Sequence, residues 1–185
     1  MSRSSVDAQQ KQDLQAQKSA AQSVPGAPGS GATQPNNGPA QVMRDGQVPK
    51  PTEKAAAQPL GKTVRYPDGV QVDVVKISHE TSTEQGRGAA PGANATIFAI
   101  RIANDSKRTL NLNQVVVTVT IDNGKTRAQP IYLDNTNDFS GTTGPHASAT
   151  TNYGFTIPTA NLANVTLIVD FDGQHTPAVF HGSAR

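Results

Sequence analysis

Apolar side chains recur at every second position in several short stretches after residue 60. Successive side chains of a β-strand point to opposite faces, so each row predicts a strand with one buried face. This repeat of two excludes a helical bundle and predicts an all-β core. The rows are Val70, Val72 and Val74; Phe98, Ile100 and Ile102; Val115, Val117, Val119 and Ile121; Ala147, Ala149, Thr151, Tyr153, Phe155 and Ile157; and Val165, Leu167, Val169 and Phe171.

Turn residues separate these rows. Asn-Gly at 123–124 predicts a two-residue hairpin turn, and Asp-Gly pairs at 68–69 and 172–173 predict further turns. The row Val70, Val72 and Val74 is followed at once by Val75 and Ile77 on the opposite face, which predicts a β-bulge near Val74 or Val75. About seven short strands joined by turns indicate an antiparallel, immunoglobulin-like β-sandwich.

The first third of the chain has a different composition. All eight aromatic residues follow residue 62, while residues 1–59 are rich in Gln, Ala, Pro, Gly, Ser and Asn. Such a segment cannot bury enough apolar surface to offset the entropy lost on ordering. We therefore expect a disordered tail and linker over 1–59 and one sandwich domain over 60–185.

The charges argue against several partners. Residues 1–61 carry six Lys and Arg against four Asp and Glu, whereas residues 62–185 carry ten against ten. A neutral domain predicts no nucleic-acid partner. The chain has no cysteine, no apolar run of the roughly 20 residues that span a bilayer, and no apolar signal-peptide core at its start. We expect either a cytosolic protein or one whose export segment is missing from this chain.

Catalytic and cofactor motifs are absent from the sequence. It contains four histidines, but no G-x-S-x-G, glycine-rich phosphate loop or H-E-x-x-H accompanies them. We therefore predict that the chain is not an enzyme and needs no cofactor. The stretch "DNTND" at 134–138 lacks the glycine and the final glutamate of an EF-hand loop, so a polar loop is the stronger interpretation.

Five segments together resemble a known family. They are "LGKTVRYPDGVQVDVVKIS", "NATIFAIRIANDSKRTLNL", "VTVTIDNGKTRAQP", "GPHASATTNYGFTIP" and "VTLIVDFDG". Over about residues 60–182 the chain is similar to the telokin-like, immunoglobulin-like accessory domain of Gram-positive secreted proteins and lipoproteins, a family of unknown function. The resemblance implies a sandwich outside the cytoplasm and transfers no functional residues. It departs from the family in lacking a lipidated cysteine or signal peptide before the tail.

The strand order predicts one recognition end. If successive strands are antiparallel, the connectors at 67–69, 104–113, 134–146 and 172–175 share one end of the sandwich. We predict that this end docks another protein, with the domain displayed on a flexible tether. The alternative is a small-ligand or divalent-cation site, in which Asp134, Asp138 and Asp172 would hold a calcium-like ion. The residues gathered there are Asp68, Asp105, Asp134, Asp138, Asp172, His146 and His175.

Overall fold

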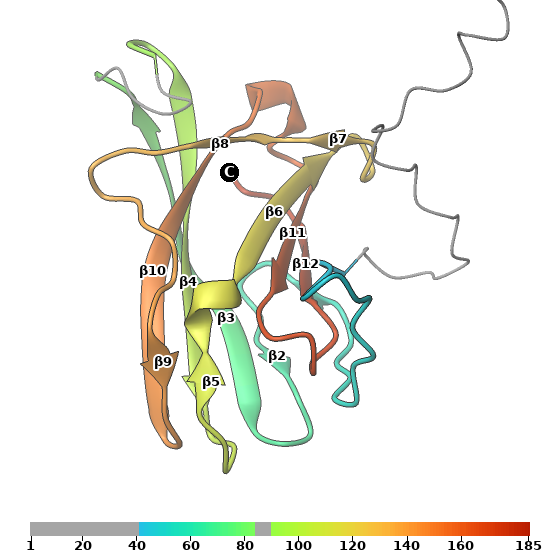
Figure 1. The fold of residues 1–185 in the computed structure, drawn as a ribbon. Coiled ribbons are helices and arrows are strands. Elements are labelled where there is room, and N and C mark those ends of the chain that lie inside the picture. Colours follow the sequence, from blue (N-terminus) through green and yellow to red (C-terminus); the bar gives the residue numbers. More distant parts are fainter. Residues whose placement is uncertain (1–40, 84–89) are drawn as a thin grey trace, which may run out of the picture. The chain divides into compact units, whose positions relative to one another are not determined.

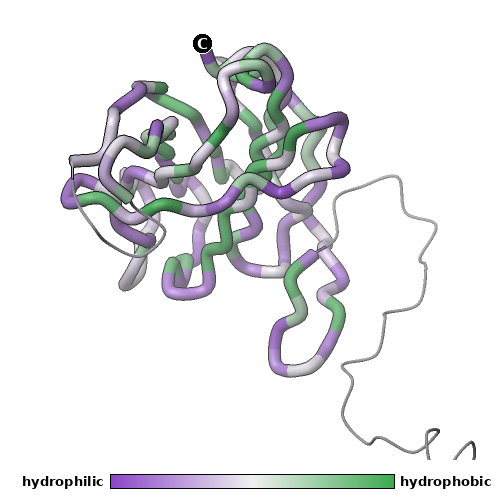
Figure 2. Tube along the Cα trace, turned by 90° about the horizontal axis from the view of Figure 1, so that it is seen from above, coloured by the Kyte–Doolittle hydropathy of each residue, from purple (hydrophilic) through white to green (hydrophobic). Residues whose placement is uncertain are grey.

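The alternating rows form the facing sides of two β-sheets (Figure 1). The computed structural model describes residues 41–83 and 90–185, which belong to a unit that spans Gly38–Arg185. The predictions for residues 1–40 lie outside the described residues. Figure 2 shows hydrophobic and hydrophilic residues interspersed along the described chain. The prediction of an all-β, antiparallel sandwich is confirmed.

The first sheet, here called the β4 sheet, has the order β2-β3-β4-β10-β8. All its neighbouring strands are antiparallel, and β3 with β4 forms its longest pair. The register of that pair shifts between Val74 and Lys76, which confirms the predicted bulge. Its strands are β2 (Val64–Arg65), β3 (Val70–Thr81), β4 (Asn94–Asn104), β8 (Gln129–Ile131) and β10 (Ala147–Thr156).

The second sheet, here called the β11 sheet, has the order β1-β12-β11-β6-β7. Its strands are antiparallel except for β1, which runs parallel to β12. Two short 3-10 helices and a small β5-β9 pair complete the helices and strands of the described residues. The sheet contains β1 (Gln58–Pro59), β6 (Val116–Ile121), β7 (Thr126–Arg127), β11 (Val165–Asp170) and β12 (Ala178–Gly182). Outside both sheets are β5 (Leu110–Asn111), η1 (Leu112–Gln114), β9 (Thr142–Thr143) and η2 (Thr159–Asn161).

The described residues thus form twelve strands rather than about seven, because six of them contain only two or three residues. The hydrophobic core lies between the sheets and takes side chains from the predicted rows. Phe98 and Phe155 pack edge to face, with ring centroids 6.2 Å apart. The core residues with no measurable exposure are Val70, Val72, Phe98, Ile100, Ile102, Val119, Val165, Leu167, Val169, Ala178, Phe180 and Ala184.

The turn after β6 is longer than predicted. Pairing between β6 and β7 begins at Ile121 and Thr126, so four residues connect the strands instead of two. Asp122, Asn123 and Gly124 all have positive φ, at 53°, 56° and 86°. The Asn-Gly signal therefore marked the turn correctly, but the left-handed backbone begins one residue earlier, at Asp122.

The segment 41–59, which we name the strap, does not behave as the predicted linker. Its residues bond to the β11 sheet, and β1 itself lies in the strap. The backbone N–H groups of Thr52 and Glu53 both donate to the carbonyl of Gln174, at 2.9 and 3.0 Å. In Figure 1 the strap runs beside β12 and the β11–β12 connector. The folded unit therefore begins before residue 60, and this part of the tail prediction is corrected.

A buried ion pair fixes the start of the strap. Arg44 contacts Asp170 at 2.5 Å, and the two side chains are only 12% and 3% exposed. The N–H of Val42 also donates to Asp170, at 2.8 Å. Asp45 and Gly46, both with positive φ, turn the chain so that Arg44 and Gln47 exchange backbone hydrogen bonds. This pair and this turn hold the strap against the sheet.

Candidate functional site

Three of the predicted site residues meet at the β11–β12 end of the sandwich. His175 Nδ1 lies 2.8 Å from Asp172 Oδ2, and His175 Nε2 lies 3.1 Å from Asp68 Oδ2. The imidazole has no exposed side-chain surface. It packs against the rings of Tyr66 and Phe171, with both centroid distances 4.7 Å. We name Asp68, Asp172 and His175 the histidine cluster.

Local turn chemistry builds this cluster. Asp172 follows β11, and its Oδ1 accepts hydrogen bonds from the N–H groups of Gln174 and His175, at 2.9 and 3.0 Å. Such an aspartate turn brings the imidazole back onto the carboxylate that starts the turn. Burial alone would raise the pKa of Asp172, but the hydrogen bonds and positive charge of His175 outweigh it and lower that pKa.

The two ring nitrogens of His175 are both engaged by carboxylates. Ionised carboxylates only accept hydrogen bonds, so both contacts are satisfied when both nitrogens carry a proton. No ring nitrogen remains for a nucleophile or a metal ion. The cluster also lies against the strap, because Glu53 and His175 form an isolated parallel β-bridge through their backbones. Its geometry is that of a buried structural centre.

Asp105 lies at the same end, and its side chain is more exposed than that of Asp68. Asp68 also contacts Arg108 at 3.4 Å, and Asp105 lies 3.7 Å from the imidazole of His146. Gly69, at φ 101°, approaches the backbone of Asp105 so closely that a Cβ would lie 2.9 Å from its carbonyl oxygen. A glycine is therefore needed where these two connectors meet. Asp68, Asp105 and His146 share one end, as predicted.

Asp134 and Asp138 do not join this end. Residues 134–138 follow β8 and run beside β10, where the N–H of Asn137 donates to the carbonyl of Asn152. The neighbouring Asn135 donates to Glu80, which lies at the opposite end of β3 from Asp68. The predicted ion site from Asp134, Asp138 and Asp172 is therefore not assembled. Within residues 41–83 and 90–185, no group of three His, Cys, Asp or Glu residues is arranged to hold a metal ion.

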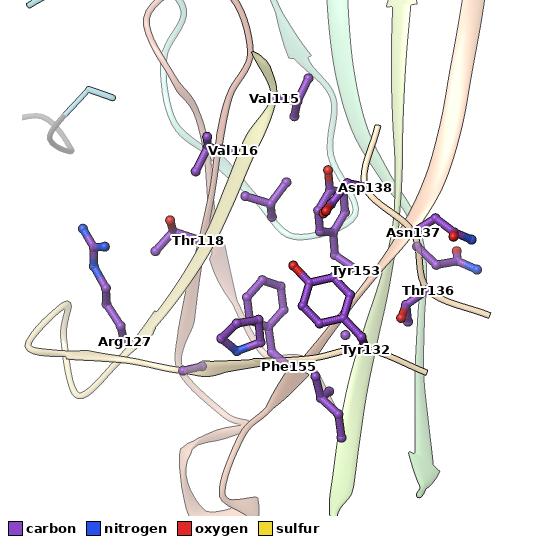
Figure 3. A pocket seen from close by; sticks show the side chains of 16 residues that line it. Val115, Val116, Thr118, Arg127, Tyr132, Thr136, Asn137, Asp138, Tyr153 and Phe155 are labelled. Carbon is purple, nitrogen blue, oxygen red and sulfur yellow. The ribbon is translucent and has the colours of Figure 1, made fainter. Parts of the chain in front are cut away.

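A groove opens at the other edge of the sandwich, between β6 and the segment that follows β8. Its volume is about 360 Å³. Figure 3 shows Val115, Val116 and Thr118 on one side and Thr136, Asn137 and Asp138 on the other, with the rings of Tyr132 and Phe155 between them. Arg127 lies beyond the β6 side. Asp138 is thus the one predicted site residue that lines this groove.

The chain itself creates the groove by changing sheets. After β7 pairs with Thr120 and Ile121, and Ala128 donates to the carbonyl of Val119, the chain crosses to β8 in the β4 sheet. Figure 1 shows this crossing between β7 and β8. Among the described residues, no strand pairs with Val116–Thr118 on the side away from β11.

The backbone N–H and carbonyl groups of successive residues in β6 point alternately to its two sides, which shows which of these groups line the free edge. The carbonyl of Val119 points toward β7, and residues two apart in a strand point to the same side. The N–H and carbonyl of Val117 therefore also point toward the groove. Unpaired backbone groups of an edge strand are a template for pairing with another chain.

The opposite wall of the groove is different because its strand edge is already covered. β8 pairs with β10 over Gly154–Thr156, and Asn137 then bonds to Asn152 on the same edge. Thr151 also donates to the carbonyl of Asn137, at 2.9 Å. β6 therefore presents the free strand edge of the groove, and β10 does not.

The floor of the groove is aromatic. Phe155 is buried, whereas Tyr132 keeps 43% of its surface exposed. Burial raises the pKa of Tyr153 to about 12, although the Phe139 N–H that donates to its hydroxyl oxygen acts in the opposite direction. The Tyr153 hydroxyl thus stays protonated at neutral pH. The floor combines apolar surface with a neutral hydroxyl group.

The sequence contained a partial signal for this groove. Val116 and Tyr132 are large apolar residues that fall on outward or loop positions, and both remain exposed in the structure, at 39% and 43%. Tyrosine is enriched at interaction surfaces, and a free strand edge is a template for pairing with another chain. That Val116 and Tyr132 line the same groove depends on the sheet change, which periodicity does not reveal.

Comparisons with known proteins add one structural likeness. The chain matches no protein-family model, and no curated protein matches it. An uncharacterized β-sandwich protein from Clostridium difficile 630 has a similar solved structure, at 18% sequence identity and a TM-score of 0.43. The match covers 72% of this chain and 98% of that one. In the described residues, no helix has the length and apolar character needed to cross a membrane.

Proposed function

We propose that this chain is a non-catalytic binding module that recognises a segment of another protein through the groove between β6 and residues 132–138. The free edge of β6 carries this proposal. A strand edge beside an apolar floor is the arrangement by which sheets capture extended peptides. The groove also combines backbone hydrogen-bonding groups with exposed aromatic surface.

The histidine cluster supports a non-catalytic role. A catalytic histidine needs one nitrogen near a nucleophile or a substrate. His175 has both nitrogens within 3.1 Å of carboxylates and no exposed side-chain surface. Tyr66, its ring neighbour, directs its hydroxyl to the carbonyl of Thr176. We assign these residues to stability rather than to chemistry.

We further propose that the module works outside the cytoplasm as a telokin-like, immunoglobulin-like accessory domain. The support is the order of strand and turn segments that resembles that family, together with the antiparallel sandwich they form. The near-neutral charge of residues 62–185 supports a protein rather than a nucleic-acid partner.

A small organic ligand is the second candidate. The observation that favours it is the groove volume of about 360 Å³, which falls within the size of small-molecule sites. A divalent cation has less support, because Asp172 is engaged by His175 and lies apart from Asp134 and Asp138.

Selection from a library of random short peptides tests the peptide-binding proposal. We expect enrichment of peptides that bind the full chain and bind its Tyr132→Ala variant more weakly, because Tyr132 supplies exposed aromatic surface in the groove. Val75→Ala is the matched control, since Val75 is similarly exposed on β3, outside the groove. No enrichment, or peptides that bind the wild type and Tyr132→Ala equally, would contradict the proposal.

A further inference from the structure

The free edge of β6 is short. β7 and the residue that follows it occupy this edge from Val119 onward, so within the described residues only Val116–Thr118 lack a neighbour on the groove side. Val117 is the residue of this stretch whose N–H and carbonyl both point into the groove. In an antiparallel pair, one residue of the added strand exchanges both hydrogen bonds with the residue opposite it. A single residue of a bound peptide can therefore satisfy both groups of Val117.

The side chain of that peptide residue would point toward the core. Val117 lies opposite Val169 of β11, which has no measurable exposure, and paired residues of neighbouring strands direct their side chains to the same face. A residue bonded to Val117 from the groove therefore directs its side chain between the two sheets, toward the floor that contains Phe155. Val116 and Thr118 point to the opposite face, so the peptide residues beside them would face away from this floor.

The space that this side chain would enter is an open end of the hydrophobic core. Val117 is only half-buried, and it lines the groove together with Ala128 and Phe155, which are buried. An apolar side chain placed beside them would remove apolar surface from water, which is the main favourable term in such contacts. The position opposite Val117 therefore favours an apolar residue.

Asp138 places a negative charge in the groove (Figure 3). Burial is the main cause of the raised pKa of Tyr153, and the charge of Asp138 adds to it, so this carboxylate lies near the Tyr153 hydroxyl. Asp138 forms no ion pair within residues 41–83 and 90–185. It lies toward the beginning of β6, because nearby Gly141 bonds to Leu112 and Asn113 just before that strand. An antiparallel peptide runs toward this beginning, so a basic side chain two residues after the apolar one would reach Asp138 on the same face.

We infer that the groove binds an extended peptide antiparallel to β6, with an apolar residue opposite Val117 and a basic residue two positions later. The apolar side chain enters between the sheets beside Phe155, and the basic one lies near Asp138. This inference rests on the proposed function and names the chemistry of its partner. The charge pair fixes register and direction more than it adds affinity.

Methylation of peptide nitrogens tests the register. The peptide Ser-Leu-Thr-Lys, with blocked ends and a fluorescent label, should bind the full chain in a fluorescence anisotropy titration and shift the amide resonance of Val117. A methyl group on the leucine nitrogen should weaken binding about tenfold, because it removes the hydrogen bond to the Val117 carbonyl. A methyl group on the threonine nitrogen is the matched control, since that N–H points away from β6, and should change binding less than about twofold.

A charge reversal tests the place of the basic side chain. The wild-type chain should bind Ser-Leu-Thr-Lys about fivefold more tightly than Ser-Leu-Thr-Glu, a difference typical of exposed charge pairs. Asp138→Lys should reverse this preference, whereas Asp134→Lys, in the same segment but outside the groove, should leave it unchanged.

Three results would overturn the inference: no binding of Ser-Leu-Thr-Lys, equal effects of the two methyl groups, or a preference that Asp138→Lys leaves unaltered. If library peptides depend on Tyr132 but these tests fail, only this inference fails. If no library peptide depends on Tyr132, the proposed function fails as well.

Discussion

The two edges of the sandwich are finished in opposite ways. At the β1 and β2 edge the strap joins the β11 sheet, and Tyr66, Phe171 and the histidine cluster are buried together. At the β7 and β8 edge the strands are short, and residues Val116–Thr118 keep a free side within the described chain. The first edge is closed by the protein's own chain, whereas the second is open to another.

The charged residues differ in the same way. Asp170 and His175 are 2% and 1% exposed, and each lies against a partner of opposite charge or a hydrogen-bonding carboxylate. Arg127 and Asp138 are exposed at the open edge. Buried charges need partners because desolvation is costly, while exposed charges tolerate separation. The difference separates residues that hold the fold from residues available to a partner.

Removing the strap should cause the largest change. A chain that begins at residue 60 should lose more than about 5 kcal/mol of unfolding free energy relative to one that begins at residue 41. The reason is that Asp170 loses Arg44 and several backbone hydrogen bonds disappear. Urea unfolding of both chains measures the difference. Equal midpoints would restore the interpretation of residues 41–59 as a linker.

His175→Ala should cost about 3–5 kcal/mol of unfolding free energy, because two largely buried carboxylates lose their shared partner. His181→Ala is the matched control, since the imidazole of His181 is exposed and lies within hydrogen-bonding distance of the hydroxyl of Thr166, not of a carboxylate. Denaturant titrations at neutral pH give both values. Similar losses for the two variants would argue against the cluster as a centre of stability.

Acid should weaken the closed edge through Asp172. Its folded pKa lies below the ordinary value of 3.8, so the unfolded chain binds the proton more tightly. The stabilisation is fully present above pH 3.8 and is lost as the pH falls through the folded pKa. We expect Asp172→Asn to flatten the decline in unfolding free energy below about pH 4. Asp134→Asn should retain the wild-type slope; an unchanged slope in Asp172→Asn would contradict the assignment.

Changes at the open edge should have the smallest effect on stability. Arg127→Glu and Tyr132→Ala should each alter the unfolding free energy by less than about 1 kcal/mol, because both side chains are exposed. Phe155→Ala, beneath the same groove, should cost about 3–5 kcal/mol because its ring is buried. Thermal and urea unfolding compare the three. A large loss in Arg127→Glu would show that this edge also supports the fold.

Much of the fold was predictable because periodicity reports which side of a strand is buried. The rows around Phe98, Val119 and Leu167 occupy the core, and the bulge at Val74 to Lys76 appears where two opposite rows meet. The strap was missed because its composition resembles a linker. Its "RDGQ" turn at 44–47 contained a hairpin signal, but only the buried Asp170 gives Arg44 a partner.

The candidate site residues also fall into a part that the sequence predicted and a part that it did not. The sequence placed Asp68, Asp172 and His175 near one another, since turn order alone brings their connectors to one end. It did not separate them from Asp134 and Asp138, because the route of the chain after β8 depends on hydrogen bonds to β10.

By itself the sequence determined the sandwich and its inward rows, because alternation of apolar residues has a direct geometric meaning in a strand. Only the tertiary structure decided which edge is closed and which is open. That outcome depends on contacts between residues far apart in the chain, such as Arg44 with Asp170 and Asp68 with His175. A residue pattern reports only its own strand or turn, so no local pattern encodes contacts between such distant residues.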